Sequence, residues 1–207
     1  MTFDAQRFER ALQLIDAANA EDPRIDRDSA GQKVPRELLY SQRMTDMLKR
    51  FAPEASEVVQ LAARAQHIQR WKVPRDGFPQ DRDGYLQWRS TLFRFHAETI
   101  TALLNLAGYE EELVMQVADA VGKRGLKVNA ESQLLEDVAN LVFVEHYLQD
   151  FASKKADYSE DKWLTIIRKT WNKMSSPARE FATGGLVALP ESFMPILVKA
   201  ISQDDTA

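Results

Sequence analysis

Residues 62–71, AARAQHIQRW, are the stretch that is most informative about the fold and the candidate site of this chain. Apolar residues repeat here at helical spacing, which predicts a helix that begins near Pro53 and runs to Trp71. Arg64, His67 and Trp71 follow one another at intervals of three or four residues, so we expect their side chains to share one helix face. The segment 71–84 contains proline and glycine and predicts an ordered basic loop.

The same region carries a local excess of positive charge, although the protein as a whole is acidic. From Arg64 to Arg94 there are seven Arg or Lys residues and three Asp residues, although the whole chain has a formal net charge of −4. The negative net charge of the whole chain disfavours non-specific electrostatic binding to duplex nucleic acid. The local excess favours a small anionic ligand, because planar guanidinium groups match phosphate oxygens in pairs.

We therefore expect a phosphorylated ligand, either a small compound or a nucleotide, with Trp71 as a candidate for stacking on a base. The alternative is a solvated helical face whose cations pair with neighbouring aspartates. The side chains that are candidates for binding this ligand are Arg43, Arg64, Gln66, Arg70, Trp71, Lys72, Arg75, Arg82 and Arg89.

Helical periodicity continues on both sides of this region. A second stretch from about Tyr85 to Ala107 predicts the helix that carries His96. No segment shows the clean alternation of a strand, so we expect an all-α fold. We expect one multi-helix domain over 1–207, with a polar loop at 24–34 and C-terminal helices in 175–207. The other predicted helices lie at about 7–20, 35–51, 110–121, 131–151, 160–174, after Pro177, and at 192–201.

Composition excludes several classes of protein. The chain has no cysteine, which rules out disulfides and thiolate metal sites. It shows neither a signal-like start nor a run approaching the roughly 18 apolar residues of a membrane span, so we expect a cytoplasmic protein without membrane partners. No Gly-rich phosphate loop, Gly-x-Ser-x-Gly elbow or His-Glu-x-x-His pair occurs, which disfavours P-loop kinases, ordinary serine hydrolases and zincin proteases.

Four short runs resemble a family catalogued as domain of unknown function 4202. That resemblance extends over nearly the whole chain, and it implies no established activity. The runs are LLYSQRM at 38–44, QHIQRW at 66–71, GYLQWR at 84–89 and LEDV at 135–138.

A remoter resemblance links the order of helices to the HD-domain metal-dependent phosphohydrolases. Gln66 and His67 stand where that superfamily has its His-Asp pair, and Arg43 stands where its first histidine is expected. The run LEDVA at 135–139 is similar to the helix with the final aspartate, which matches Asp137. The resemblance implies a divergent HD fold and hydrolysis of a phosphorylated compound.

The departures leave a reduced set of metal ligands. Arginine has no lone pair to donate, so Arg43 cannot bind a metal. His67, His96 and Asp137 remain as ligands for one divalent ion, with an activated water as nucleophile. Glu136 beside Asp137 is a candidate general base.

Several alternatives stay open. Arg43 could itself replace the cation and leave the pocket without metal. The histidines could also be hydrogen-bonded at the edge of the core, with Asp137 paired to Arg43 or Arg64. We therefore weigh a phosphohydrolase, the leading hypothesis, against a non-catalytic module for an anionic nucleotide or metabolite and against a helical protein-interaction domain.

Overall fold

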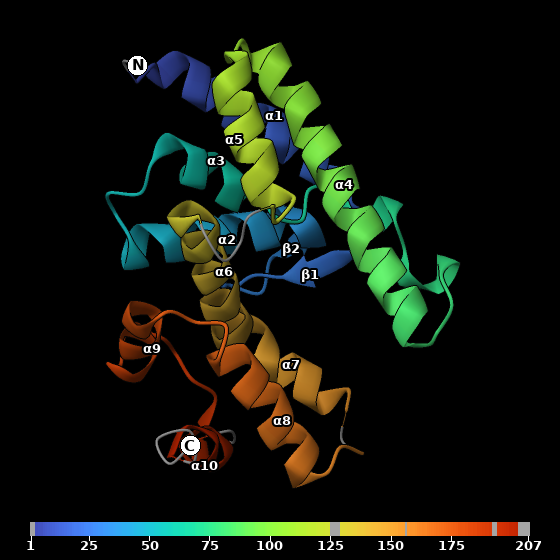
Figure 1. Cartoon of the computed structure of the whole chain (residues 1–207), viewed down its shortest axis with the longest axis vertical. Helices are drawn as coiled ribbons and strands as arrows, with labels where there is room; N and C mark the ends of the chain where they lie inside the picture. Colours follow the sequence, from blue (N-terminus) through green and yellow to red (C-terminus); the bar gives the residue numbers. More distant parts are fainter. Residues whose placement is uncertain (1–2, 125–128, 156, 192–193, 203–207) are drawn as a thin grey trace. The chain divides into compact units, whose positions relative to one another are not determined.

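The computed structural model describes residues 3–124, 129–155, 157–191 and 194–202, with the side chains of 201 and 202 left aside. The chain divides into two compact units, Met1–Leu135 and Glu136–Ala207. Almost every element of the described part is helical, which confirms the all-α expectation (Figure 1). No helix among these residues is both long and apolar enough to cross a bilayer.

The first unit is a set of helices packed around one apolar core. The helix α1 packs against α2, α3 and α4, while α5 lies along α4 and also contacts α3 (Figure 1). Ile15, Met44, Leu61, Ile100 and Val117 are all fully or almost fully buried between these helices. The helices of this unit are α1 (Ala5–Ala20), α2 (Arg36–Phe51), α3 (Glu57–Ala65), α4 (Arg82–Ala107) and α5 (Glu111–Val121).

A small hairpin replaces part of the polar loop expected at 24–34. Strands β1 (Ile25–Arg27) and β2 (Lys33–Pro35) pair antiparallel, with Asp26 opposite Val34. The turn between them is closed by Asp28, whose carboxylate accepts the backbone N–H groups of Ala30 and Gln32. The prediction of a plain loop was wrong here because three-residue strands are too short to show alternation.

The helix expected from Pro53 to Trp71 is much shorter. It begins after Ser56, whose hydroxyl accepts the N–H of Val59 as an N-cap, and it ends at Ala65. Residues 66–69 form a turn, and two short 3-10 turns follow, η1 (Arg70–Lys72) and η2 (Arg75–Gly77). His67 therefore lies in the turn and not on a helix face shared with Arg64 and Trp71.

Gln69 explains why the helix does not continue. Its backbone is left-handed, with φ of 49°, and its N–H donates to the side-chain oxygen of Asn19 at 3.0 Å. Asn19 is buried at the end of α1. A contact with a distant helix thus overrides the local helical periodicity.

The second unit is also helical and has its own core, to which Leu141, Leu148 and Ile167 contribute. The stretch expected as one helix over 131–151 contains α6 and α7 with a π-helical turn between them. The helix α6 spans the boundary between the units, and α8 packs against α10. The elements are α6 (Ala130–Val142), η3 (Phe143–Tyr147), α7 (Leu148–Ser153), α8 (Glu160–Trp171), α9 (Ser176–Thr183) and α10 (Met194–Ser202).

Candidate anion-binding site

A cavity of about 130 Å³ opens in the first unit, and we call it the α4 pocket. Its walls come from the turn after α3, the first half of α4 and the end of α5. Tyr85, Trp88 and Phe93 supply aromatic rings. The polar side chains that line it are Gln66, His67, Arg70, Arg89, His96 and Lys123.

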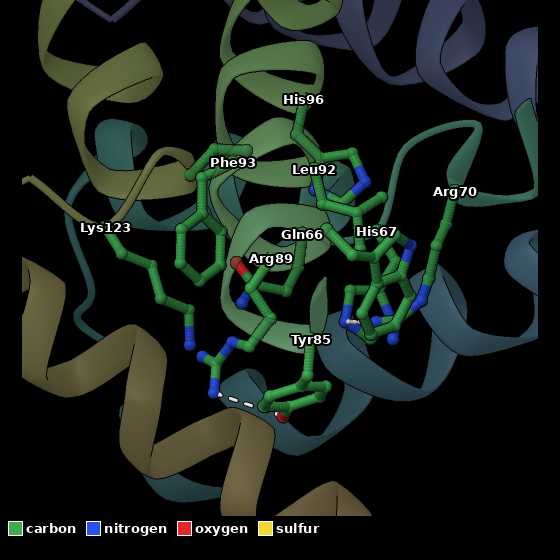
Figure 2. Close-up of a pocket in the computed structure, with 11 residues that line it drawn as sticks. Gln66, His67, Arg70, Tyr85, Arg89, Leu92, Phe93, His96 and Lys123 are labelled. Atoms are coloured by element: carbon green, nitrogen blue, oxygen red, sulfur yellow. Dashed lines mark hydrogen bonds between the residues drawn. The ribbon is translucent and has the colours of Figure 1, made fainter. Parts of the chain in front are cut away.

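Each of the three cations of the α4 pocket, Arg70, Arg89 and Lys123, lies near an aromatic ring. Arg89 and Lys123 both lie against Phe93, with the guanidinium carbon 5.1 Å and the ammonium nitrogen 5.8 Å from the ring centre (Figure 2). Arg70 lies 5.1 Å from the ring centre of Trp88. Cation–π contacts of this kind fix the position of a charge without neutralising it. No carboxylate is among the described residues that line the cavity.

The neighbours of His67 show which of its ring nitrogens carries the proton. Arg70 Nη1 lies 2.8 Å from His67 Nε2, and arginine can only donate, so Nε2 accepts and the proton is on Nδ1. Nδ1 faces the buried carboxylate of Glu37 at 3.7 Å, and the imidazole stacks on Tyr40. Burial, reinforced by the charge of Arg70, lowers the pKa of His67 well below its ordinary value. His67 is therefore neutral at pH 7.

An acidic network behind the pocket supports His67 and Arg70. Arg24 donates to Glu37 at 2.7 Å and makes two bonds of 2.9 Å to Asp22, which also accepts the backbone N–H of Glu37. Burial raises the pKa of Glu37, while Arg70 and Arg24 oppose that rise. Sequence reasoning missed Glu37, because an acid in the first turn of a helix is the ordinary partner of the helix dipole.

Two buried side chains of the pocket have polar atoms without a protein partner. His96 is 2% exposed and neither ring nitrogen has a hydrogen bond, while Gln66 is 4% exposed and its side-chain oxygen has none. Burial, with Arg70 and Lys123 adding to it, lowers the pKa of His96 to about 3. Its imidazole is thus neutral and offers one N–H and one lone pair. An unmet buried polar group costs about 1–3 kcal/mol, so both groups call for a partner, which a bound water or a ligand supplies.

The structure brings some of the predicted residues together. Gln66, His67, Arg70, Arg89 and His96 all line the α4 pocket. They belong to segments that are close in sequence, and Figure 2 shows His96 on the side of His67, while Arg89 extends toward Lys123 and Tyr85.

The remaining predicted ligand-binding residues lie elsewhere. Arg64 makes a two-pronged ion pair with Asp16 of α1, both distances being 2.6 Å, because α3 presents it to α1. Arg75 donates to the carbonyls of Phe78 and Asp81, which closes its own loop. Trp71 is absent from the lining and Arg82 is exposed at the first turn of α4. Lys72 faces Glu21 at 3.8 Å, and Arg43 donates to the carbonyl of Arg27 at 3.4 Å.

The predicted acids belong to the second unit. Asp137 is 2% exposed, and its two oxygens accept the backbone N–H and the hydroxyl of Ser175 at 2.8 and 2.6 Å. Ser175 is the N-cap of α9, so Asp137 supports the start of that helix. Glu136 is also buried and faces Lys173 at 3.7 Å. Arg64, one of the two arginines weighed as a partner for Asp137, pairs with Asp16 of α1.

These contacts bear on the predicted divalent ion. His67 Nε2 and both oxygens of Asp137 already make hydrogen bonds, whereas the nitrogens of His96 are open. In the part of the chain that the structure describes, no group of three or more His, Asp or Glu side chains is placed to share an ion. Among the described lining residues only His96 offers an open nitrogen donor, which is one ligand where a bound divalent ion takes three or more, and the three-ligand site stays a prediction.

Lys123 was not among the residues predicted to bind the ligand. It follows α5 by two residues, and the sequence signal is only a cation beside the helix-ending Gly122. The folded chain brings it to a helix that ends before residue 108.

Comparison with known proteins identifies the family to which this chain is similar. A family model described as a domain of unknown function, DUF4202, matches residues 9–196. No curated protein and no solved structure gives a significant match.

Proposed function

The chain belongs to the DUF4202 family, and we propose that this family member binds a small phosphorylated compound in the α4 pocket. The observation that carries the proposal is the pair of buried, unpartnered groups on His96 and Gln66 beside three cations. The described lining residues include no carboxylate, and the buried Glu37 behind the pocket offsets part of the charge of Arg70.

A phosphoryl group meets the needs of this lining. Burial lowers the pKa of Arg70, which means that its positive charge is poorly solvated. A bound anion would therefore stabilise that charge. Guanidinium groups bind two phosphate oxygens at once, and such bonds strengthen where water is excluded. The neutral His96 can donate to a third oxygen. A hydroxyl on the ligand can donate to Gln66.

The size of the cavity limits the ligand. A volume of about 130 Å³ is well below the roughly 300–1,000 Å³ of pockets that enclose drug-sized ligands. The rings that could stack on a base are already covered on one side by arginine and lysine. We therefore propose that the pocket recognises the phosphoryl end and that a nucleobase adds little.

Calorimetric titration of the whole protein with inorganic phosphate, ribose 5-phosphate and adenosine monophosphate tests this. We expect binding of the two esters with similar affinities. Arg89→Gln should raise Kd at least about tenfold, since it removes a charge-assisted contact. Arg94→Gln removes the same charge from an exposed position of α4 and should leave Kd unchanged. Absence of binding by all three compounds, or equal effects of the two variants, would refute the proposal.

Hydrolysis of the bound ester is a second candidate, favoured by the open nitrogens of the neutral His96. A divalent ion would need ligands in addition to His96, and if bound it would supply Lewis-acid chemistry and an activated water. Metal analysis of protein prepared without chelator, with release of phosphate from ribose 5-phosphate measured in the presence of Mn²⁺, tests it. Binding without any release would leave the protein as a binding module.

A further inference from the structure

Two residues other than glycine have a left-handed backbone in the described part of the chain. They are Gln69, with φ of 49°, and Lys123, with φ of 56°. Gln69 immediately precedes the pocket cation Arg70, and Lys123 is itself a pocket cation. Side chains with a Cβ disfavour this conformation, and such outliers gather at functional sites.

Lys123 stands where a glycine is the usual choice. The N–H of Arg124 donates to the carbonyl of Asp119 and the N–H of Lys123 to that of Ala120. These two bonds define the Schellman motif at the end of α5, with Lys123 at its left-handed position. Helices that end in this way mostly have glycine there, because glycine adopts the conformation without steric cost. A lysine at this point weakens the helix end, so its side chain requires another explanation.

The neighbouring residue shows that the end of α5 is placed closely against α4. A Cβ on Gly122 would lie 2.9 Å from the carbonyl oxygen of Ala118 and 3.4 Å from the Cβ of Ala97 on α4. This close approach lets the side chain of Lys123 reach Phe93 and enter the lining of the α4 pocket (Figure 2). A glycine at 123 would end the helix equally well but would bring no charge to the cavity.

We propose that Lys123 is a ligand-binding residue of the α4 pocket, whose ammonium contacts the phosphoryl group and whose strained backbone is retained for that contact. The inference rests on the proposed function and extends it to a residue on a separate element. Arg70, Arg89 and Lys123 then surround the ligand with three positive charges, which suits a phosphate monoester dianion better than a monoanion.

The substitution Lys123→Gly tests both halves of the inference, because stability should rise while affinity for the ligand falls. Relief of the left-handed strain should raise Tm by about 2 °C. Loss of the ammonium should raise Kd for ribose 5-phosphate at least about tenfold, measured by calorimetry on the whole protein. Lys123→Asn keeps a residue that tolerates this backbone, so it should lose affinity equally with little change in Tm.

Arg124→Gln is the matched control, since it removes the next charge along the chain from a side chain that is 74% exposed. It should change neither Tm nor Kd. Wild-type affinity in Lys123→Gly would overturn the inference and leave the proposed function intact. A lower Tm in Lys123→Gly would overturn the argument from strain. Failure of the wild-type protein to bind any of the three compounds would instead refute the proposed function.

Discussion

The surroundings of His96 are unusual for a histidine. It is almost fully buried, its nitrogens have no protein partner, and its pKa is lowered to about 3. In the unfolded chain an imidazole titrates near 6.5. Between these values the unfolded state binds the additional proton, so stability falls as the pH drops from about 7 toward 3. His67, whose pKa is also lowered, acts in the same direction.

The substitution His96→Leu should flatten this dependence. Urea unfolding between pH 7 and pH 5 should show about 2 kcal/mol less loss of stability than in the wild type, since one depressed imidazole is removed. At pH 7 the variant should be as stable as the wild type or about 1 kcal/mol more stable, because the unmet polar group is gone. His96→Gln should flatten the profile while keeping a buried polar group. Parallel pH profiles for wild type and His96→Leu would contradict this account.

At the scale of elements, the start of α4 and the loop before it behave as one piece. Asp81 caps α4 by accepting the N–H of Gly84 at 2.8 Å, and the indole N–H of Trp88 donates to the carbonyl of Val73 at 2.9 Å. A Cβ on Gly84 would lie 2.2 Å from the carbonyl oxygen of Pro79, which no side chain can tolerate. The absence of a side chain at Gly84 is what lets the loop lie on the helix that carries Arg89 and His96.

We therefore expect Gly84→Ala to force the loop away from α4. The free energy of unfolding should fall by about 1–3 kcal/mol, as for other overpacked sites, and affinity for phosphate should fall with it. Gly77→Ala in the same loop is the control, because no atom lies within 4 Å of its added Cβ. It should alter the free energy of unfolding by less than about 0.5 kcal/mol. Thermal unfolding and calorimetry measure both, and equal effects of the two alanines would argue against this packing.

At the scale of the whole molecule, the chain separates a unit with the α4 pocket from a unit that contains Asp137 and Glu136. The described residues that line the pocket all belong to Met1–Leu135. The second unit has an apolar core of its own, including the fully buried Leu148. Binding in the pocket should therefore depend on the first unit alone.

A matched pair of leucine truncations tests this division. Leu148→Ala should cost about 2–5 kcal/mol of stability, the usual range for a buried leucine, yet leave Kd for phosphate within about twofold. Leu92→Ala removes the same atoms from a buried residue of the pocket wall and should weaken binding. Loss of binding in a folded Leu148→Ala protein would show that the second unit takes part in the site.

The sequence by itself determined the helices and much of the pocket. Long helices such as α4 follow from their own periodicity, which depends only on neighbours along the chain. Gln66, His67, Arg70, Arg89 and His96 were predicted as site residues, under ligand and metal roles that the structure does not test, and they lie within 31 consecutive positions. Short separation along one turn and one helix leaves few ways to keep such residues apart.

Only the tertiary structure decided which other residues join or leave that group. Lys123 lines the pocket because Gly122 allows the end of α5 to lie close to α4. Arg64 lies outside the pocket because its guanidinium pairs with Asp16 of α1. The turn that places His67 exists because Asn19 holds the backbone of Gln69. Each of these contacts joins residues about 25 to 50 positions apart. Such pairings are set by how whole helices pack, and local sequence patterns carry no record of them.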